Sequence, residues 1–151
     1  MEAKFKFTLE KLLDIRIEKE EESKRKFTKT QREKQIAEEK LEELTNSYNK
    51  YNGINPGETL NYQKIKKNYL FALDKGMTQI EKELESKTKE LEVRRTDLVK
   101  KQVDRKTVDI LKENKKIEFY KEQDRVEQIT LDELALYAYI RNSWREVKKS
   151  A

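Results

Sequence analysis

Carboxylate pairs one helical turn apart, such as Glu38 and Glu42, are the residues of this sequence whose types and spacing could do chemistry. Two carboxyl groups on one helical face could serve as a general acid and a general base. Charged residues, however, make up 43% of the chain, so such pairs are expected on any solvent-exposed helix. We therefore interpret them as surface charge and predict that the protein is not an enzyme.

The residue types that are missing exclude further kinds of site. The chain has no cysteine and no histidine, so it lacks thiol chemistry, disulfides, and Ser–His or Cys–His nucleophilic sites. Histidine is also the commonest metal ligand in proteins, so its absence makes a metal site less expected. Three scattered glycines cannot form the glycine-rich loop that cradles a phosphate. We expect no catalytic residue, no cofactor and no metal site.

The charge balance argues against nucleic acid as a partner. The net charge is +5, from 35 basic and 30 acidic residues. Basic runs such as Lys24-Arg25-Lys26 lie beside acidic ones such as Glu20-Glu21-Glu22, and no base-reading module is recognisable. Charged runs of this kind usually form solvated helix faces.

The same composition limits the fold. Apolar residues make up only 34% of the chain, too few for a wide compact core, which leaves a helical rod or a disordered chain. Leucine, isoleucine and aromatic residues recur at helical spacing and favour the rod. We predict an all-α fold: an antiparallel two-helix coiled coil, or long helical hairpin, forming one elongated domain over residues 1–151.

The only proline and two of the glycines mark a single break. Asn52-Gly53 and Pro56-Gly57 are turn dipeptides. They predict a helix over about 9–52, a turn over 53–59 and a longer helix over about 60–145. Thr8 is the predicted N-cap of the first helix, and Thr59 is the predicted N-cap of the second. Phe7 and Leu12 are spaced to form a hydrophobic staple at the start of the first helix.

Heptad spacing predicts which positions of the two helices face each other, a set called the seam below. In the first helix it runs Leu9, Leu13, Arg16, Glu20, Ser23, Phe27, Thr30, Lys34, Ala37, Leu41, Leu44, Tyr48, Tyr51. In the second it runs Leu70, Leu73, Met77, Ile80, Leu84, Lys87, Leu91, Arg94, Leu98, Lys101, Arg105, Val108. Because the middle of the first set is polar, we expect loose pairing there.

The two helices are unequal in length, about 65 Å and 130 Å at 1.5 Å per residue. A simple hairpin would leave about half of the second helix unpaired. Gly76 is a candidate break that would let the C-terminal part fold back onto the first helix. Alternatively, the apolar set Phe119, Val126, Ile129, Leu136, Ile140 forms a docking surface. The stretch 129–140 is apolar nearly all round, so we expect it to be covered.

No segment predicts insertion into a membrane. The longest apolar run, Leu134–Ile140, has seven residues, against the roughly 20 that a spanning helix needs. The first residues lack the apolar core of a secretory signal. We expect a soluble, cytoplasmic protein.

Four segments, in this order, resemble the flagellar type III export protein FliJ family. The first is Phe5-Lys6-Phe7-Thr8-Leu9-Glu10 with the charged run that follows it. The second is the mid-chain break with Asn61-Tyr62-Gln63 and the stripe Tyr69, Leu73, Gly76, Ile80. The third and fourth are Leu111-Lys112-Glu113 leading to Phe119-Tyr120, and Glu127–Ala135.

This resemblance implies a stalk that inserts into the hexameric ring of the export ATPase and promotes its assembly and activity. The other end of the stalk would contact the cytoplasmic domain of the membrane export gate, and the protein would also handle export chaperones. The protein would be cytoplasmic, peripheral to the inner membrane and not inserted in it, and would serve flagellum biogenesis, motility and chemotaxis. The alternative is a free-standing export chaperone, or a generic coiled-coil oligomerisation protein with no role in an ATPase ring.

The resemblance also implies two sets of partner-binding residues. The gate-binding set would be Tyr69, Leu73, Gly76 and Ile80, although Leu73 and Ile80 are equally well explained as seam positions. The ring-binding set would be Phe5, Phe7, Leu12, Leu131, Asp132, Leu136 and Ile140.

Overall fold

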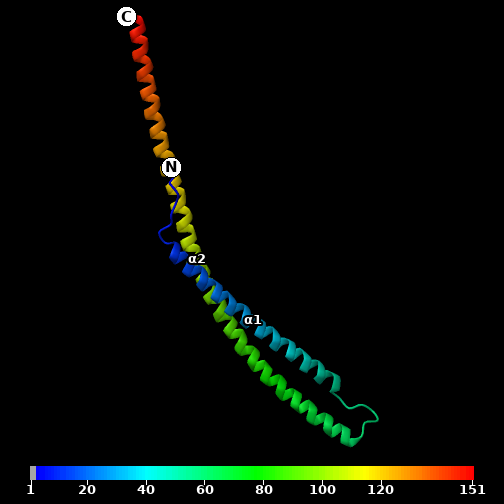
Figure 1. Ribbon diagram of the computed structural model, residues 1–151. Helices are drawn as coiled ribbons and strands as arrows, with labels where there is room; N and C mark the ends of the chain where they lie inside the picture. Colours follow the sequence, from blue (N-terminus) through cyan, green and yellow to red (C-terminus); the bar gives the residue numbers. More distant parts are fainter. Residues whose placement is uncertain (1–2) are drawn as a thin grey trace. The chain divides into compact units, whose positions relative to one another are not determined.

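The computed structural model describes residues 3–151 and contains two helices, α1 (Glu10–Tyr51) and α2 (Leu60–Ser150), with no strand among these residues. The helices run side by side in opposite directions as a hairpin (Figure 1). The predicted all-α helical hairpin is therefore confirmed. Contacts group the described residues into two units, one of residues 15–104 and one of residues 3–14 with 105–151. One domain over 1–151 stays a prediction, and its first two residues lie outside the described part.

Two glycines of the turn between the helices adopt positive φ angles, which residues with a Cβ rarely adopt. Gly53, two residues after the end of α1, has a φ of 100°, which suits a left-handed helix end. Gly57 has a φ of 95° and follows Pro56, as in a type II turn, and the Glu58 amide donates to the Asn55 carbonyl at 3.4 Å. The predicted capping by Thr59 is confirmed, because its hydroxyl oxygen accepts from the Tyr62 amide at 3.3 Å.

The start of α1 differs from the expectation by one residue. The hydrogen bond that opens the helix runs from the Leu13 amide to the Leu9 carbonyl, so Leu9 rather than Thr8 holds the capping position. The preceding turn is closed by the Glu10 amide, which donates to the Phe7 carbonyl at 3.3 Å. This turn takes up Thr8 and Leu9, so Phe7 lies one residue too far from the cap for the predicted staple.

Helix α2 is continuous through Gly76, so the candidate break at this residue was wrong, and the docking surface stays a prediction. A glycine inside a helix costs about 1 kcal/mol relative to alanine, and packing outweighs that cost here. A Cβ built on Gly76 would lie 3.4 Å from the Leu44 Cδ1, so this small residue faces α1 at close range. The C-terminal part of α2 therefore does not fold back onto α1 at this glycine.

The core of the unit formed by residues 15–104 follows the predicted seam. Every predicted seam residue of α1 and α2 except Leu9 is buried or half-buried, and the residues between them are mostly exposed. The apolar members with the least exposure in this unit are Ala37, Leu73 and Leu91, at 4%, 7% and 6%. Ser23 and Thr30 are equally buried, at 4% and 3%. Heptad spacing thus predicted which faces of the helices meet.

In the other unit, an N-terminal segment packs on α2. Leu13 and Val108 are its buried residues, and the rings of Phe5 and Phe119 lie 5.6 Å apart. The Lys112 ammonium pairs with the Glu10 carboxylate at 2.8 Å. From Asp124 onward every residue of α2 is exposed, so the expected cover over 129–140 is not supplied by the part of this chain that the structure describes.

Candidate partner-binding surfaces

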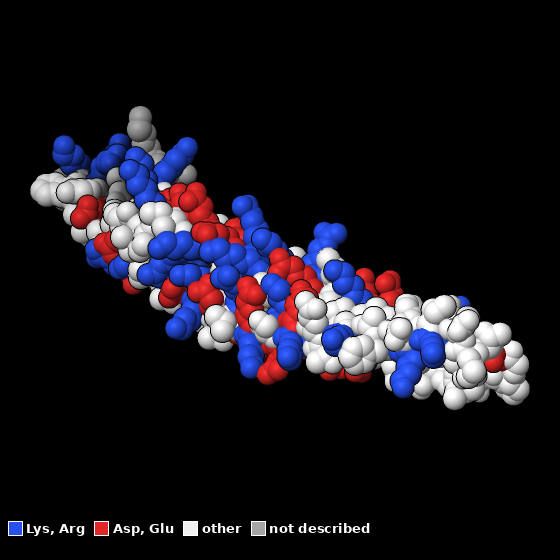
Figure 2. Space-filling view, turned by 90° about the horizontal axis from the view of Figure 1, so that it is seen from below, with Lys and Arg blue, Asp and Glu red and all other residues white. Residues whose placement is uncertain are grey.

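The turn and its flanks form a nearly uncharged end of the hairpin. Between Tyr51 and Gln63 the only charged residue is Glu58. Figure 2 shows this end, at the right of the view, mainly in white, whereas basic and acidic side chains alternate along the helices. Ile54 and Leu60 are 78% and 77% exposed there. An uncharged surface with exposed apolar side chains is suited to contact another protein.

One ion pair fixes the turn to α2. The Lys66 ammonium donates to Glu58 Oε1 at 3.0 Å, and these side chains are only 8% and 12% exposed. The hydrogen bond from Lys66 lowers the pKa of the Glu58 carboxyl. Burial raises this pKa by a smaller amount, so the pKa stays below its ordinary value. The Gln63 side-chain amide also donates to the Glu58 carbonyl, at 3.4 Å. The turn is therefore held by side chains as well as by its glycines.

The predicted gate-binding residues do not form one exposed stripe. Leu73 is buried, and Gly76 and Ile80 are half-buried on the same seam face of α2. Tyr69 lies at the margin, 44% exposed, with its ring edge-on to that of Tyr51 at 5.5 Å. Of these four residues, Tyr69 presents the most surface to a partner.

Sequence reasoning missed exposed apolar residues on the outer face of α2 near the turn. Ile65 and Phe71 are 67% and 62% exposed, and the Lys75 ammonium lies 4.6 Å from the centre of the Phe71 ring. The signal was present in the sequence, because these residues lie off the seam and have no place in the hairpin core.

The polar middle of the seam is closed by cross-helix hydrogen bonds, in contrast to the loose pairing expected. The Ser23 hydroxyl donates to Asp97 Oδ2, and the Arg16 guanidinium donates to the Asp104 carbonyl, both at 2.7 Å. Ser23 is small enough for the helices to approach each other, and its hydroxyl finds a partner there. Heptad counting could not detect this, since it does not pair positions across the seam.

A further cross-helix contact lies nearer the turn. The Lys87 ammonium donates to Glu33 Oε2 at 2.7 Å and to Glu90 Oε2 at 3.3 Å. The hydrogen bond from Lys87 lowers the pKa of Glu33, and the same bond is the main cause that raises the pKa of Lys87. The pair helps to fix the register of α1 against α2.

The predicted ring-binding residues fall into two groups. Phe5, Phe7 and Leu12 are half-buried, and Phe7 has the Lys112 ammonium 6.0 Å from its ring centre. Leu131, Leu136 and Ile140 are exposed on α2, at 61%, 57% and 42%. Asp132 is also exposed, and its Oδ1 accepts a hydrogen bond from the Gln128 side-chain amide at 3.1 Å. The first group packs within the chain, and the second is available to a partner.

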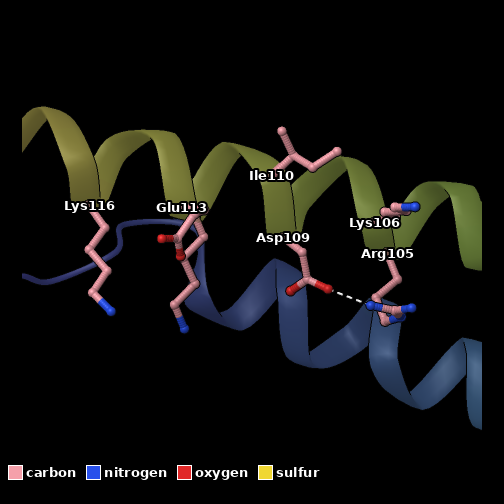
Figure 3. A pocket seen from close by; sticks show the side chains of 7 residues that line it. Arg105, Lys106, Asp109, Ile110, Glu113 and Lys116 are labelled. Carbon is pink, nitrogen blue, oxygen red and sulfur yellow. Dashed lines mark hydrogen bonds and ion pairs between the residues drawn. The ribbon is translucent and has the colours of Figure 1, made fainter.

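A shallow hollow of about 550 Å³ lies on α2. Its lining residues are Arg105, Lys106, Asp109, Ile110, Lys112, Glu113, Lys116. Figure 3 shows the ion pair between Arg105 and Asp109 at one end and Ile110 turned away from the partner helix. All seven residues belong to one helix, so the hollow has the character of a charged helix surface rather than of a ligand pocket.

Residues 3–151 contain neither a metal-binding cluster nor a membrane-spanning helix. No group of three or more acidic residues there is placed to hold a metal ion. No helix in the same range is both long enough and apolar enough to cross a membrane.

Comparison with protein families decides where the chain belongs. The family model described as "Flagellar FliJ protein" matches residues 5–143, almost the whole chain. The chain belongs to the flagellar FliJ family. It is therefore a component of the flagellar export apparatus, and this family is one of export components rather than of enzymes. No curated protein and no solved structure matched the chain.

Proposed function

We propose that this FliJ-family chain links the hexameric export ATPase to the membrane export gate. In this proposal the C-terminal part of α2 enters the ATPase ring and promotes its assembly and hydrolysis. The hairpin end near the turn meets the cytoplasmic domain of the gate protein, and the chain also handles export chaperones. The chain acts in the cytoplasm, at the face of the inner membrane, without entering the bilayer.

The exposed C-terminal part of α2 is the observation that carries the proposal. Ten large apolar side chains are exposed between residues 124 and 150: Val126, Ile129, Leu131, Leu134, Leu136, Tyr137, Tyr139, Ile140, Trp144, Val147. Monomeric proteins rarely expose so much apolar surface in one stretch unless a partner covers it. A single bare helix is also slim enough to be surrounded by several subunits of a ring, since its diameter is only about 10–12 Å.

Ring assembly and hydrolysis test this proposal directly. The purified chain is mixed with the export ATPase, and hexamer formation is followed by light scattering while phosphate release is measured. We expect the chain to increase both, and the double variant Leu136→Lys with Ile140→Lys to lose most of the increase. Val93→Lys is the matched control, because Val93 is also exposed on α2, at 66%, but outside the C-terminal stretch. No effect of the native chain on either readout would favour the free-standing chaperone.

The gate contact is tested separately. We expect Tyr69→Ala to weaken binding to the purified cytoplasmic domain of the gate protein, measured by calorimetry. Tyr120→Ala is the control, since Tyr120 is 48% exposed and also packs edge-on against a neighbouring ring, that of Phe119 at 5.5 Å. Equal affinities of the two variants would remove Tyr69 from the gate contact.

A further inference from the structure

The exposed part of α2 carries one continuous face. Val126, Ile129, Leu136, Ile140, Trp144 and Val147 lie on it, and Glu133 and Tyr137 complete the pattern. At 100° per residue, these eight positions fall within an arc of about 100°, the width of a face that packs on one partner helix. The face also lies in line with Phe119, seven residues before Val126, which packs on Phe5 of the same chain.

The spacing along this face is the same in both directions. From Val126 to Val147 the intervals are 3, 4, 3, 1, 3, 4 and 3, with the centre between Leu136 and Tyr137. An antiparallel second copy would therefore place Val126 against Val147, Ile129 against Trp144 and Leu136 against Tyr137. A face with this symmetry is self-complementary, as a two-fold interface requires.

Charge follows the same symmetry. Residues 124–133 hold four acidic residues and one basic residue, a net charge of −3. Residues 141–149 hold four basic residues and one acidic residue, a net charge of +3, and 134–140 hold none. Antiparallel pairing sets the acidic block of one copy against the basic block of the other, with Asp132 opposite Arg141. Parallel pairing would set acid against acid and base against base, which is unfavourable.

We propose that residues 124–149 of α2 bind a second copy of this chain as an antiparallel, two-fold symmetric helix pair. The pairing needs no ATPase and is independent of the function proposed above. If both proposals hold, the pair covers the surface that the ring would use, so that self-association and ring binding exclude each other.

The mass of the purified full chain tests the pairing. In sedimentation equilibrium we expect the average mass to rise with concentration from 18.2 kDa toward twice that value. Leu136→Lys, at the centre of the pair, should keep the chain at the lower mass while helix content is unchanged. A chain that stays at the lower mass up to submillimolar concentration, or that grows past the dimer, overturns the proposal.

Charge exchange tests the orientation. Asp132→Arg places like charges opposite each other at two symmetric points, and we expect the dimer to weaken by about tenfold. Arg141→Asp should have the same effect. The double variant with both substitutions restores opposite charges in the antiparallel pair, so its affinity should return to near the native value. Additive weakening in the double variant would overturn the antiparallel arrangement.

Cross-linking provides a measurement that does not depend on affinity. The native chain has no cysteine, so engineered cysteines are the only thiols. A chain carrying both Val126→Cys and Val147→Cys should form disulfide-linked dimers on mild oxidation, because the two positions face each other. Val126→Cys alone is the control: in the antiparallel pair its two copies are about 30 Å apart, far beyond disulfide reach. Efficient cross-linking of that single variant would indicate a parallel pair.

Discussion

Polar side chains that cross between the helices decide how the middle of the hairpin closes. Ser23 donates to Asp97 from a position that is only 4% exposed, and Arg16 reaches a backbone carbonyl of α2. A hydroxyl inserted between two helices stabilises them only if it has a partner, because an unpaired polar group in such a place is costly. These bonds therefore favour one register of the two helices over its neighbours.

Replacing Ser23 with alanine tests this bond. Ser23→Ala leaves the Asp97 carboxylate without its cross-helix donor, and we expect the free energy of unfolding to fall by about 1–2 kcal/mol. Thr96→Ala is the control, because the Thr96 hydroxyl is exposed and donates to Glu92 in its own helix at 3.0 Å. Urea unfolding followed by circular dichroism measures both. Equal losses would show that the Ser23 bond does not stabilise the hairpin.

At the scale of elements, the turn and the glycine inside α2 fix how the helices meet. Gly53 and Gly57 adopt positive φ, and Thr59 caps the following helix. Gly76 instead stays helical and allows close approach of Leu44. The same residue type therefore shapes the turn at two positions and allows close packing at a third.

The Glu58–Lys66 pair should make the turn sensitive to acid. Because the pKa of Glu58 is lower in the folded chain, its contribution to stability is present above the ordinary value of 4.5 and is lost as pH falls through the folded value. We expect Glu58→Gln to lower the melting temperature at neutral pH and to match the native chain in acid.

Glu85→Gln provides the comparison for that experiment. Glu85 pairs with Lys89 of its own helix, and both side chains are at least two-thirds exposed. Exposed pairs contribute little to stability, so this variant should melt close to the native temperature at neutral pH. A difference between Glu58→Gln and the native chain that persists unchanged into acid would contradict the assigned role of the carboxylate.

Gly76→Ala should stabilise α2. Alanine removes most of the conformational penalty of glycine, and its Cβ would meet only the flexible end of Leu44 at 3.4 Å. We expect a gain of up to about 1 kcal/mol in the free energy of unfolding. Gly57→Ala should instead lose about 1–2 kcal/mol, because its φ of 95° is strained for any residue with a Cβ. Denaturant titration of both variants checks the opposite signs.

Across the whole molecule, local stability should vary along the chain. Residues 15–104 share a continuous seam, whereas every residue from Asp124 onward is exposed. We expect amide hydrogens of the helical residues in the seam to exchange slowly with solvent, and those of residues 124–150 to exchange faster. Hydrogen exchange in dilute solution, followed by mass spectrometry, measures both. Uniform protection along α2 would show that its C-terminal part has a cover that the chain itself does not supply.

Much of this architecture could be predicted from the sequence, because heptad spacing reports directly which faces are buried. Every seam position from Leu13 onward was predicted in this way, and the break was predicted from its Asn-Gly and Pro-Gly turn dipeptides. Among the expectations that failed, loose pairing at the polar middle of the seam was wrong because heptad spacing does not name the partner of Ser23, which is Asp97 of the other helix. The cap lies at Leu9 because of a local turn, closed by the Glu10 amide, that the sequence pattern did not indicate. A single chain also carries no direct signal for which exposed face a partner occupies, so the gate-binding and ring-binding residues stay predictions.

The pairing of distant residues has a consequence for how the protein is made. Tyr51 and Tyr69 meet across the turn, 18 residues apart, whereas the Glu10–Lys112 pair joins residues 102 apart. Closing a short loop loses less chain entropy, so we expect the helices to zip together from the turn outward. The ribosome adds about 5–20 residues per second, so Lys112 is synthesised roughly 5–20 s after Glu10. During that interval the aromatic N-terminal segment lacks its partner and is exposed to chaperones.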